Sequence, residues 1–173
     1  IQQGRELGKD AWWYICVGPR GKDVLNWFTQ YPAIRARLLM GAATWKYQPD
    51  GFLYYRTAGW IYGDGPITDG PMTDWLPRYH PGLPDGDGQI ICAGPDGPLT
   101  TIRLENIRDG IEDYEYLWLL DSLSPGRDQL AARVPEDLLT DLTHYSEDPS
   151  VLGAWRESIA EAIEALAKET DRP

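Results

Sequence analysis

The sequence contains little that would support several common kinds of site. Its 173 residues include only two cysteines, two histidines and two phenylalanines. Cys16 and Cys92 match no metal-binding spacing and form no disulfide framework, and both stand in apolar, strand-like runs, so we expect buried free thiols. His80 and His144 are single and far apart, which argues against a metal centre. We therefore expect no metal and no cofactor.

Basic residues are scarce relative to acidic ones. The chain carries 16 Lys and Arg against 27 Asp and Glu, which gives a formal net charge of −11. Nucleic acids and anionic membrane surfaces bind clustered positive charge, and the sequence has no basic patch. No apolar run is long enough to span a bilayer. We therefore expect neither nucleic acid nor a membrane as a partner.

Aromatic residues are plentiful but uneven, with eight Trp and ten Tyr beside the two Phe. Trp and Tyr combine a flat apolar face with a polar group, which suits partly wet sites such as sugar-binding pockets. The same residues also fill ordinary hydrophobic cores. Composition alone leaves both roles open.

Hydrophobic patterning predicts alternating strands and helices. Residues 11–17, 51–56 and 89–93 have the apolar, aromatic and β-branched composition of buried strands. A helical stretch that opens at Pro32 separates the first two, and another helix follows the third. The residues expected on the buried face of that second helix are Ile107, Ile111, Tyr114 and Trp118.

The C-terminal part is predicted to be purely helical. Pro135 fits the first turn of one helix, and Leu138, Leu142 and Tyr145 would share its buried face. Asp148 is expected to cap a last helix that has Pro149 at its first position. The residues expected to form the apolar stripe of that helix are Val151, Trp155, Ile159 and either Ile163 or Leu166.

This order of elements predicts an α/β fold with parallel strands. Three strands cannot close a barrel, and a complete eightfold β/α barrel needs about 250 residues. The chain therefore fits either a small open sheet or the C-terminal portion of a (β/α)8 TIM-type barrel followed by extra C-terminal helices. The absence of Met before Ile1 favours the second. We expect a barrel portion in residues 1–121 and a helical extension in residues 122–173.

Working groups of β/α folds lie on the loops that follow the strands, here residues 18–31, 57–88 and 94–100. The middle loop is long and rich in Trp and Tyr, which predicts an ordered wall of an active site. The alternative is a loop that only covers the rim of the fold. Within it, "PDGDGQI" at 84–90 has a faint likeness to a calcium loop, but a polar turn leading into a strand explains it better. Motifs for a nucleophilic serine or for phosphate binding are absent.

The segment 101–120, "TIRLENIRDGIEDYEYLWLL", concentrates charge. Its residues Glu105, Arg108, Asp109 and Glu112 stand at helical spacings of three and four, which suits ion pairs along one side of a helix. Arg103 could pair with a carboxylate through two hydrogen bonds. A catalytic pair would need one carboxyl with a raised pKa beside an apolar wall. We interpret the segment as a structural network that includes Arg103 and Asp109.

Three stretches in this order resemble the domain at the C-terminal end of glycoside hydrolase family 123 and its uncharacterised relatives. They are "WWYICVGP", "NWFTQYPAIRARLLMGAATWKYQPDGFLYYRTAGW" and "TIRLENIRDGIEDYEYLWLL". The resemblance covers residues 8–121. It implies a β/α barrel and retaining hydrolysis of β-linked N-acetylhexosamine, typically N-acetylgalactosamine. In such enzymes the acetamido oxygen of the substrate attacks the anomeric carbon, with help from an adjacent Asp-Glu pair. Resemblance also suggests a secreted or periplasmic protein.

The chain departs from the family pattern, because it contains no Asp-Glu dipeptide in that order. We therefore assign no catalytic residue here and expect the pair in a missing N-terminal part of the barrel, so that this chain alone would be inactive. For the glycan substrate, strand-end placement predicts Trp60 and Trp75 as pocket aromatics and Tyr55 as a hydrogen-bond donor. The rival hypotheses are a non-catalytic carbohydrate-binding module, which would use the same aromatics, and an inert fragment.

Overall fold

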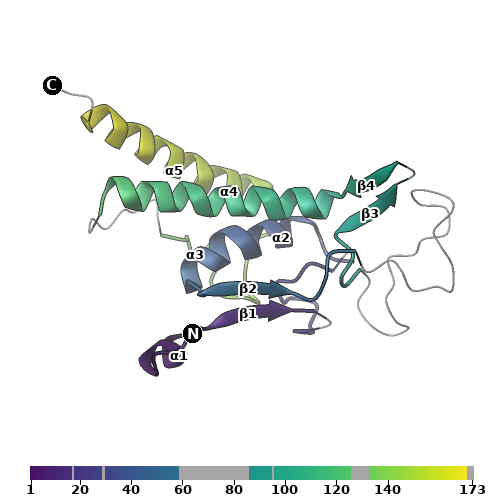
Figure 1. The fold of residues 1–173 in the computed structure, drawn as a ribbon. Helices are drawn as coiled ribbons and strands as arrows, with labels where there is room; N and C mark the ends of the chain where they lie inside the picture. Colours follow the sequence, from purple (N-terminus) through teal and green to yellow (C-terminus); the bar gives the residue numbers. More distant parts are fainter. Residues whose placement is uncertain (17, 29, 59–85, 95, 126–132, 171–173) are drawn as a thin grey trace, which may run out of the picture.

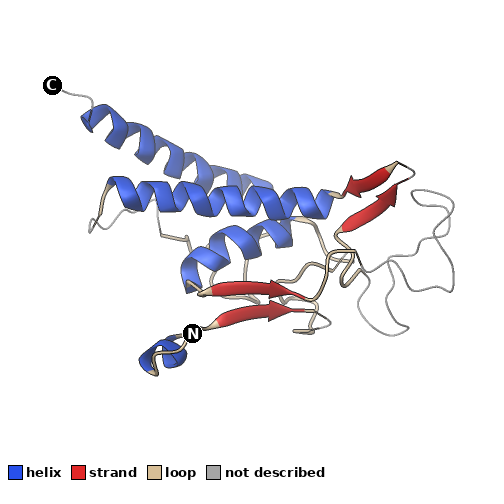
Figure 2. Cartoon of the chain, viewed as in Figure 1, coloured by secondary structure: helices blue, strands red, loops and turns tan. Residues whose placement is uncertain are grey.

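The computed structural model describes residues 1–16, 18–28, 30–58, 86–94, 96–125 and 133–170. Helices and short strands alternate in the first half, and two long helices dominate the second (Figure 2). In chain order the elements are α1 (Gln2–Glu6), β1 (Trp12–Ile15), α2 (Ile34–Leu38), the π-helix η1 (Leu39–Ala43), α3 (Thr44–Tyr47), β2 (Gly51–Tyr54), β3 (Ile91–Gly94), β4 (Gly97–Thr100), α4 (Ile102–Leu123) and α5 (Pro149–Thr170).

Two separate two-stranded sheets are present among the described residues. Strands β1 and β2 pair in parallel, with Trp12 opposite Gly51 and Ile15 opposite Tyr54. Strands β3 and β4 form an antiparallel hairpin instead. Side chains alternate along a strand, so Ile15 and Tyr54 share the face toward the helices while Trp12 lies on the opposite face.

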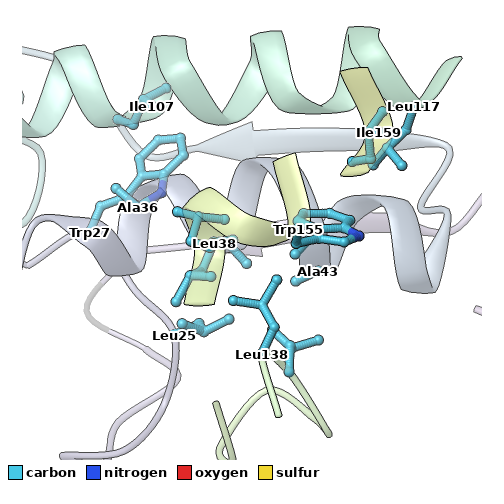
Figure 3. Packing of buried hydrophobic residues seen from close by; sticks show 14 of the residues in the cluster. Leu25, Trp27, Ala36, Leu38, Ala43, Ile107, Leu117, Leu138, Trp155 and Ile159 are labelled. Carbon is cyan, nitrogen blue, oxygen red and sulfur yellow. The ribbon is translucent and has the colours of Figure 1, made fainter. Parts of the chain in front are cut away.

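The helices cover one face of the β1–β2 sheet. Figure 1 shows α2 and α3 between this sheet and α4, with α5 packed alongside α4. Side chains from every layer meet in one hydrophobic core, part of which Figure 3 shows. The buried members of this core are Ile15, Leu25, Trp27, Ala36, Leu38, Leu39, Ala42, Ala43, Ile90, Ile107, Leu117, Leu120, Leu138, Leu139, Leu152, Trp155 and Ile159. None of the described helices is long and apolar enough to cross a membrane.

A close crossing sets how α4 lies on α2 and η1. A Cβ atom added to Gly110 would lie 2.6 Å from the carbonyl oxygen of Arg37 and 2.8 Å from Cβ of Met40. On the other side of the crossing, a Cβ added to Gly41 would lie 3.1 Å from the carbonyl oxygen of Gly110. The two glycines therefore allow backbone-to-backbone contact that a larger residue would block.

A buried carboxylate fastens the same crossing. Asp113 is 1% exposed, and its oxygens accept hydrogen bonds from Nε of Arg37 at 2.6 Å and from Nη2 of Arg37 at 2.9 Å. Nε of Arg156 in α5 donates to the same carboxylate at 2.7 Å. The hydrogen bond to Asp113 is the main cause that raises the pKa of Arg37. One carboxylate thus ties α2, α4 and α5 together.

Several sequence expectations are confirmed. The strands around residues 12–15 and 51–54 form and pair in parallel, and helices form near residues 34–47 and 102–123. The last helix begins at Pro149, where Oδ1 of Asp148 accepts a hydrogen bond from the Ser150 N–H at 2.9 Å. The mixed helix and strand composition agrees with the expected α/β class, although the described residues form no closed barrel.

Three expectations about the elements are wrong. The strand near residues 89–93 does not extend the parallel sheet, because β3 pairs with β4, which occupies most of the expected loop at 94–100. No helix forms over residues 135–145. Instead, Oδ1 of Asp141 accepts hydrogen bonds from the N–H groups of Thr143 and His144, at 2.7 and 2.9 Å, and turns the chain back.

The third error concerns the buried face of α4. Ile107 is buried as expected, but Ile111 is 45% exposed and Trp118 is 57% exposed. Gly110 and Asp113 face inward instead, because Gly110 makes the close crossing and Asp113 makes the buried ion pairs. The helix is therefore rotated relative to the orientation that a purely hydrophobic stripe predicts.

We expect Gly110→Ala to lower the free energy of unfolding by about 1–3 kcal/mol, because the new methyl group overpacks the crossing. The matched control is Gly153→Ala in α5, where an added Cβ meets nothing within 4 Å. There the higher helix propensity of alanine should stabilise the protein by up to about 1 kcal/mol. Urea unfolding followed by circular dichroism measures both; equal effects of the two substitutions would contradict the close crossing.

We also expect Asp113→Asn to destabilise the protein by about 3 kcal/mol, because it removes the buried negative charge that Arg37 and Arg156 share. Asp109→Asn serves as control, since its carboxylate is 33% exposed and lies 3.7 Å from Nη1 of Arg37. That change should cost less than about 1 kcal/mol. If thermal and urea unfolding show Asp109→Asn to be the more destabilising change, the ion pairs of Asp113 are not a main source of stability.

Candidate functional site

The parallel strands β1 and β2 end at the same edge of their sheet, and buried polar side chains gather there. We name Tyr54, Asp87 and Arg103 the strand-end cluster. Tyr54 ends β2, Asp87 lies in the turn that precedes β3, and Arg103 lies in the first turn of α4. Asp87 is 1% exposed and Arg103 is 4% exposed. Charged residues are rarely buried to this extent without a partner.

Asp87 is a buried acid. Neither oxygen of its carboxyl makes a hydrogen bond of standard geometry within the described part of the chain. Burial raises its pKa above the ordinary range, while the Tyr54 hydroxyl and the positive charge of Arg56 act in the opposite direction. Burial of this kind disfavours the ionised form of the carboxyl.

Tyr54 is influenced by both charged members of the cluster. Its hydroxyl accepts a hydrogen bond from the Gly88 N–H at 2.7 Å. Burial raises the pKa of Tyr54 strongly, the charge of Asp87 raises it further, and the charge of Arg103 lowers it. The ring packs edge-on against Trp27, with centroids 4.6 Å apart, and this fixes the phenol at the strand end.

Arg103 reaches the cluster from α4. Thr101 caps this helix, since its hydroxyl accepts the Leu104 N–H at 3.1 Å and donates to the Ile90 carbonyl at 2.6 Å. Nη2 of Arg103 donates to the carbonyl of Tyr31 at 2.9 Å, whereas Nε and Nη1 have no hydrogen-bond partner among the described residues. Burial lowers the pKa of Arg103 to about 10. The expected two-pronged pairing of Arg103 with a carboxylate does not occur within the described ranges.

The loop after β1 contacts this cluster through the Tyr31 carbonyl, which accepts the hydrogen bond from Arg103. Asn26 is fully buried, and its Oδ1 accepts the Trp27 N–H at 2.6 Å. The Tyr31 hydroxyl donates to the carbonyl of Gly21 at 3.0 Å. These contacts order the part of the segment 18–31 that the structure describes, which agrees with its expected place among the strand-end loops.

An aromatic surface lies on the face of the β1–β2 sheet that the helices leave uncovered. We name it the open face. Its members alternate with the core residues along both strands: Trp12, Tyr14, Leu53 and Tyr55. Their exposed fractions run from 41% at Tyr55 to 62% at Trp12. Exposed aromatic rings on one face of a parallel sheet are unusual, because such sheets are normally covered on both faces.

Of the three predicted substrate-binding residues, the structure describes only Tyr55. It lies directly after β2, on the open face, and the guanidinium of Arg56 lies 5.0 Å from the centre of its ring. Trp60 and Trp75 lie outside the described residues, as does most of the long loop that contains them. Their predicted role stays a prediction.

The charged segment of α4 forms the structural network expected for it, apart from Arg103. Arg108 forms ion pairs with Glu105, with Asp109 at 3.0 Å and with Glu112 at 3.5 Å. The buried carboxylate of the segment, Asp113, is engaged by two arginines. A carboxylate held in this way is not available as an acid or base.

No group of three or more His, Cys, Asp or Glu side chains that could hold a metal ion occurs among the described residues. Both cysteines are free thiols, with Cys92 buried and Cys16 partly exposed. The polar turn expected at residues 84–90 is present over Gly86–Gln89, where the Gln89 N–H donates to the Gly86 carbonyl at 3.2 Å.

Sequence reasoning missed Asp87. The available signal was the "GDG" triplet at residues 86–88, in which both glycines take positive φ angles of 85° and 73°. We interpreted the triplet as a turn, which is correct, but nothing local indicates that the turn folds back onto the end of β2. The side chains of Asp87 and Arg103 are buried, so this cluster can position neighbouring residues rather than contact a ligand directly.

Comparison with known families gives one result. The profile of a family described as "Glycoside hydrolase 123, catalytic domain" matches residues 1–120. The search of curated proteins finds no match. The matched range includes both parallel strands and the whole strand-end cluster.

We expect Asp87→Asn to stabilise the protein, and to do so more as the pH rises. The folded state raises the pKa of Asp87, so the wild type binds its proton more tightly when folded and loses stability as the pH rises through that pKa. The variant has no such loss. Urea unfolding from about pH 4 to about pH 8 should show the difference between the two proteins growing.

The control, Asp50→Asn, should behave in the opposite way. The Ala11 N–H donates to Oδ2 of Asp50 at 2.8 Å, and this bond, followed by Arg5, lowers the pKa of Asp50. The carboxylate therefore stabilises the fold above its ordinary pKa, and this stabilisation is lost as the pH falls. A stability difference for Asp87→Asn that does not change with pH would show that folding does not raise the pKa of Asp87.

Proposed function

This chain belongs to glycoside hydrolase family 123, and we propose that it supplies part of the catalytic barrel of a hydrolase that cleaves β-linked N-acetylhexosamine, typically N-acetylgalactosamine. The observation that carries the proposal is the family match over residues 1–120. The matched region contains two parallel strands whose carboxyl ends adjoin a buried polar cluster, and active sites of β/α folds lie at such ends.

The architecture supports a barrel portion. Helices cover one face of the β1–β2 sheet, and the open face exposes aromatic side chains that a neighbouring layer would normally bury. Further strands from an N-terminal part of the same enzyme would pair with the two free strand edges and complete the sheet. In this arrangement the open face lines the interior of the barrel, and Tyr55 stands at its upper end.

The chemistry would come from outside this chain. The sequence has no adjacent Asp-Glu pair in that order, and the buried carboxylate of α4, Asp113, is held by two arginines. We propose that the acetamido oxygen of the substrate attacks the anomeric carbon while an upstream Asp-Glu pair orients it and transfers the proton. The residues described here would shape the sugar pocket, with Tyr55 as a hydrogen-bonding and stacking residue.

The test is an assay of the longer protein, including the upstream coding sequence, with an aryl β-N-acetylgalactosaminide. We expect release of the aryl alcohol with retained anomeric configuration, measured by absorbance and by NMR of the first product. The activity should fall by at least about 10³-fold when the upstream Glu is replaced by Gln. Hydrolysis that persists in this variant would contradict the proposed placement of the catalytic pair.

A non-catalytic carbohydrate-binding module is the second candidate, and the exposed aromatic open face favours it. Stacking on such rings needs no acid. The two candidates differ in what the 173-residue chain does alone. Retardation on an immobilised N-acetylgalactosamine column, together with an inactive longer protein, would support the binding module over the hydrolase.

A further inference from the structure

The turn Gly86–Gln89 has a backbone conformation that depends on its two glycines. Gly86 and Gly88 have φ angles of 85° and 73°, which side chains other than hydrogen rarely allow. The turn closes through the hydrogen bond from the Gln89 N–H to the Gly86 carbonyl at 3.2 Å. Between the glycines it carries Asp87 into the protein, where the side chain is buried.

Backbone contacts fasten this turn to the end of β2. The Gly88 N–H donates to the Tyr54 hydroxyl at 2.7 Å. Just beyond the turn, the N–H groups of Ile90 and Ile91 both donate to the carbonyl of Thr57, at 3.0 and 3.2 Å. The turn therefore cannot shift without breaking contacts to the residues that follow β2.

The same turn supports the side chains at the strand end. A Cβ atom added to Gly88 would lie 2.9 Å from Cγ of Arg56 and 3.3 Å from Cδ1 of Tyr55. Both side chains thus pack against the bare backbone of Gly88. The ring of Tyr55 remains 41% exposed, so its orientation on the open face depends on the position of the turn.

We propose that Asp87 and Tyr54 are positioning residues of the sugar site: they hold the Gly86–Gln89 turn against Tyr55 and Arg56, so that the Tyr55 side chain is presented to an N-acetylhexosamine glycan. This inference rests on the proposed function, because it takes the open face as the substrate side. Asp87 is buried and does not touch the glycan itself. Its effect passes through Tyr54 and Gly88.

The charged and titratable groups around Asp87 explain why a proton matters here. The Tyr54 hydroxyl at the end of β2 and the Arg56 guanidinium just after it both lower the pKa of Asp87. The charge of Asp87 in turn raises the pKa of Tyr14 in β1. The charge of Arg103, in α4, lowers the pKa of Tyr54. Deprotonation places a negative charge in the buried turn, and the hydration that this charge loses there disfavours the arrangement that holds the turn.

The test compares Tyr54→Phe, Asp87→Asn and Asp87→Ala in the longer protein, using the aryl β-N-acetylgalactosaminide and its pH profile. We expect Tyr54→Phe and Asp87→Ala to raise KM by about tenfold, with kcat changed by less than about threefold, since a positioning residue affects how the sugar is held. Asp87→Asn should keep near-normal KM and should lack the rise in KM that we expect for the wild type as the pH increases. Asp121→Asn, exposed on α4, is the control and should change neither constant.

Other outcomes are decisive in different ways. Kinetic constants and pH profiles of all three variants equal to those of the wild type overturn the positioning role and leave the hydrolase intact. A fall in kcat with unchanged KM also overturns it, because that pattern indicates a direct part in the chemistry. If Asp87→Ala does not fold, Tyr54→Phe, which removes one oxygen, still tests the positioning role.

A wild type with neither turnover nor saturable sugar binding overturns the proposed function, and this inference with it.

Discussion

The carboxylate of Asp113 is the point on which the arrangement of the helices depends. It is almost completely buried and accepts hydrogen bonds from two arginines, one in α2 and one in α5. Burying a charge costs several kcal/mol unless its partners are well placed, so the three helices are stable together only in the geometry that satisfies it. The contact of Gly41 with Gly110 brings the backbones close enough for this to happen. Ile15 of β1 shares one hydrophobic core with residues of these helices.

The strand-end cluster presents the opposite situation. Asp87 and Arg103 are as buried as Asp113, yet they make few of the hydrogen bonds that burial normally requires. Unsatisfied buried polar groups lower stability, and natural proteins concentrate them at functional sites. The contrast between a satisfied carboxylate in the helix layer and an unsatisfied one at the strand ends therefore separates the part of the chain that provides stability from the part that we assign to the sugar site.

The sequence predicted those features that depend on local chemistry. The cap at Asp148, the proline at the start of α5 and the apolar strands are local signals, and all three are confirmed. The features that it did not predict depend on distant contacts. The rotation of α4 follows from the close contact of Gly110 with the backbone of Arg37, which lies 73 positions earlier in the sequence. The role of Asp87 depends on the turn meeting Tyr54, and Trp60 and Trp75 lie outside the described residues, so the larger part of the predicted pocket stays a prediction.

The open face connects the fold to the choice between the two candidate functions. In a carbohydrate-binding module the aromatic rings would face solvent permanently. The two edges of the β1–β2 sheet, which pair with no other strand among the described residues, would need another form of protection. In a barrel portion, further strands would satisfy the edges and enclose the rings, leaving only the residues at the carboxyl ends in contact with substrate. The barrel arrangement accounts for both the exposed rings and the unpaired strand edges, because added strands would cover the first and pair with the second. It also explains why the unsatisfied acid lies at the carboxyl end of the strands, since the substrate of a barrel enzyme binds there.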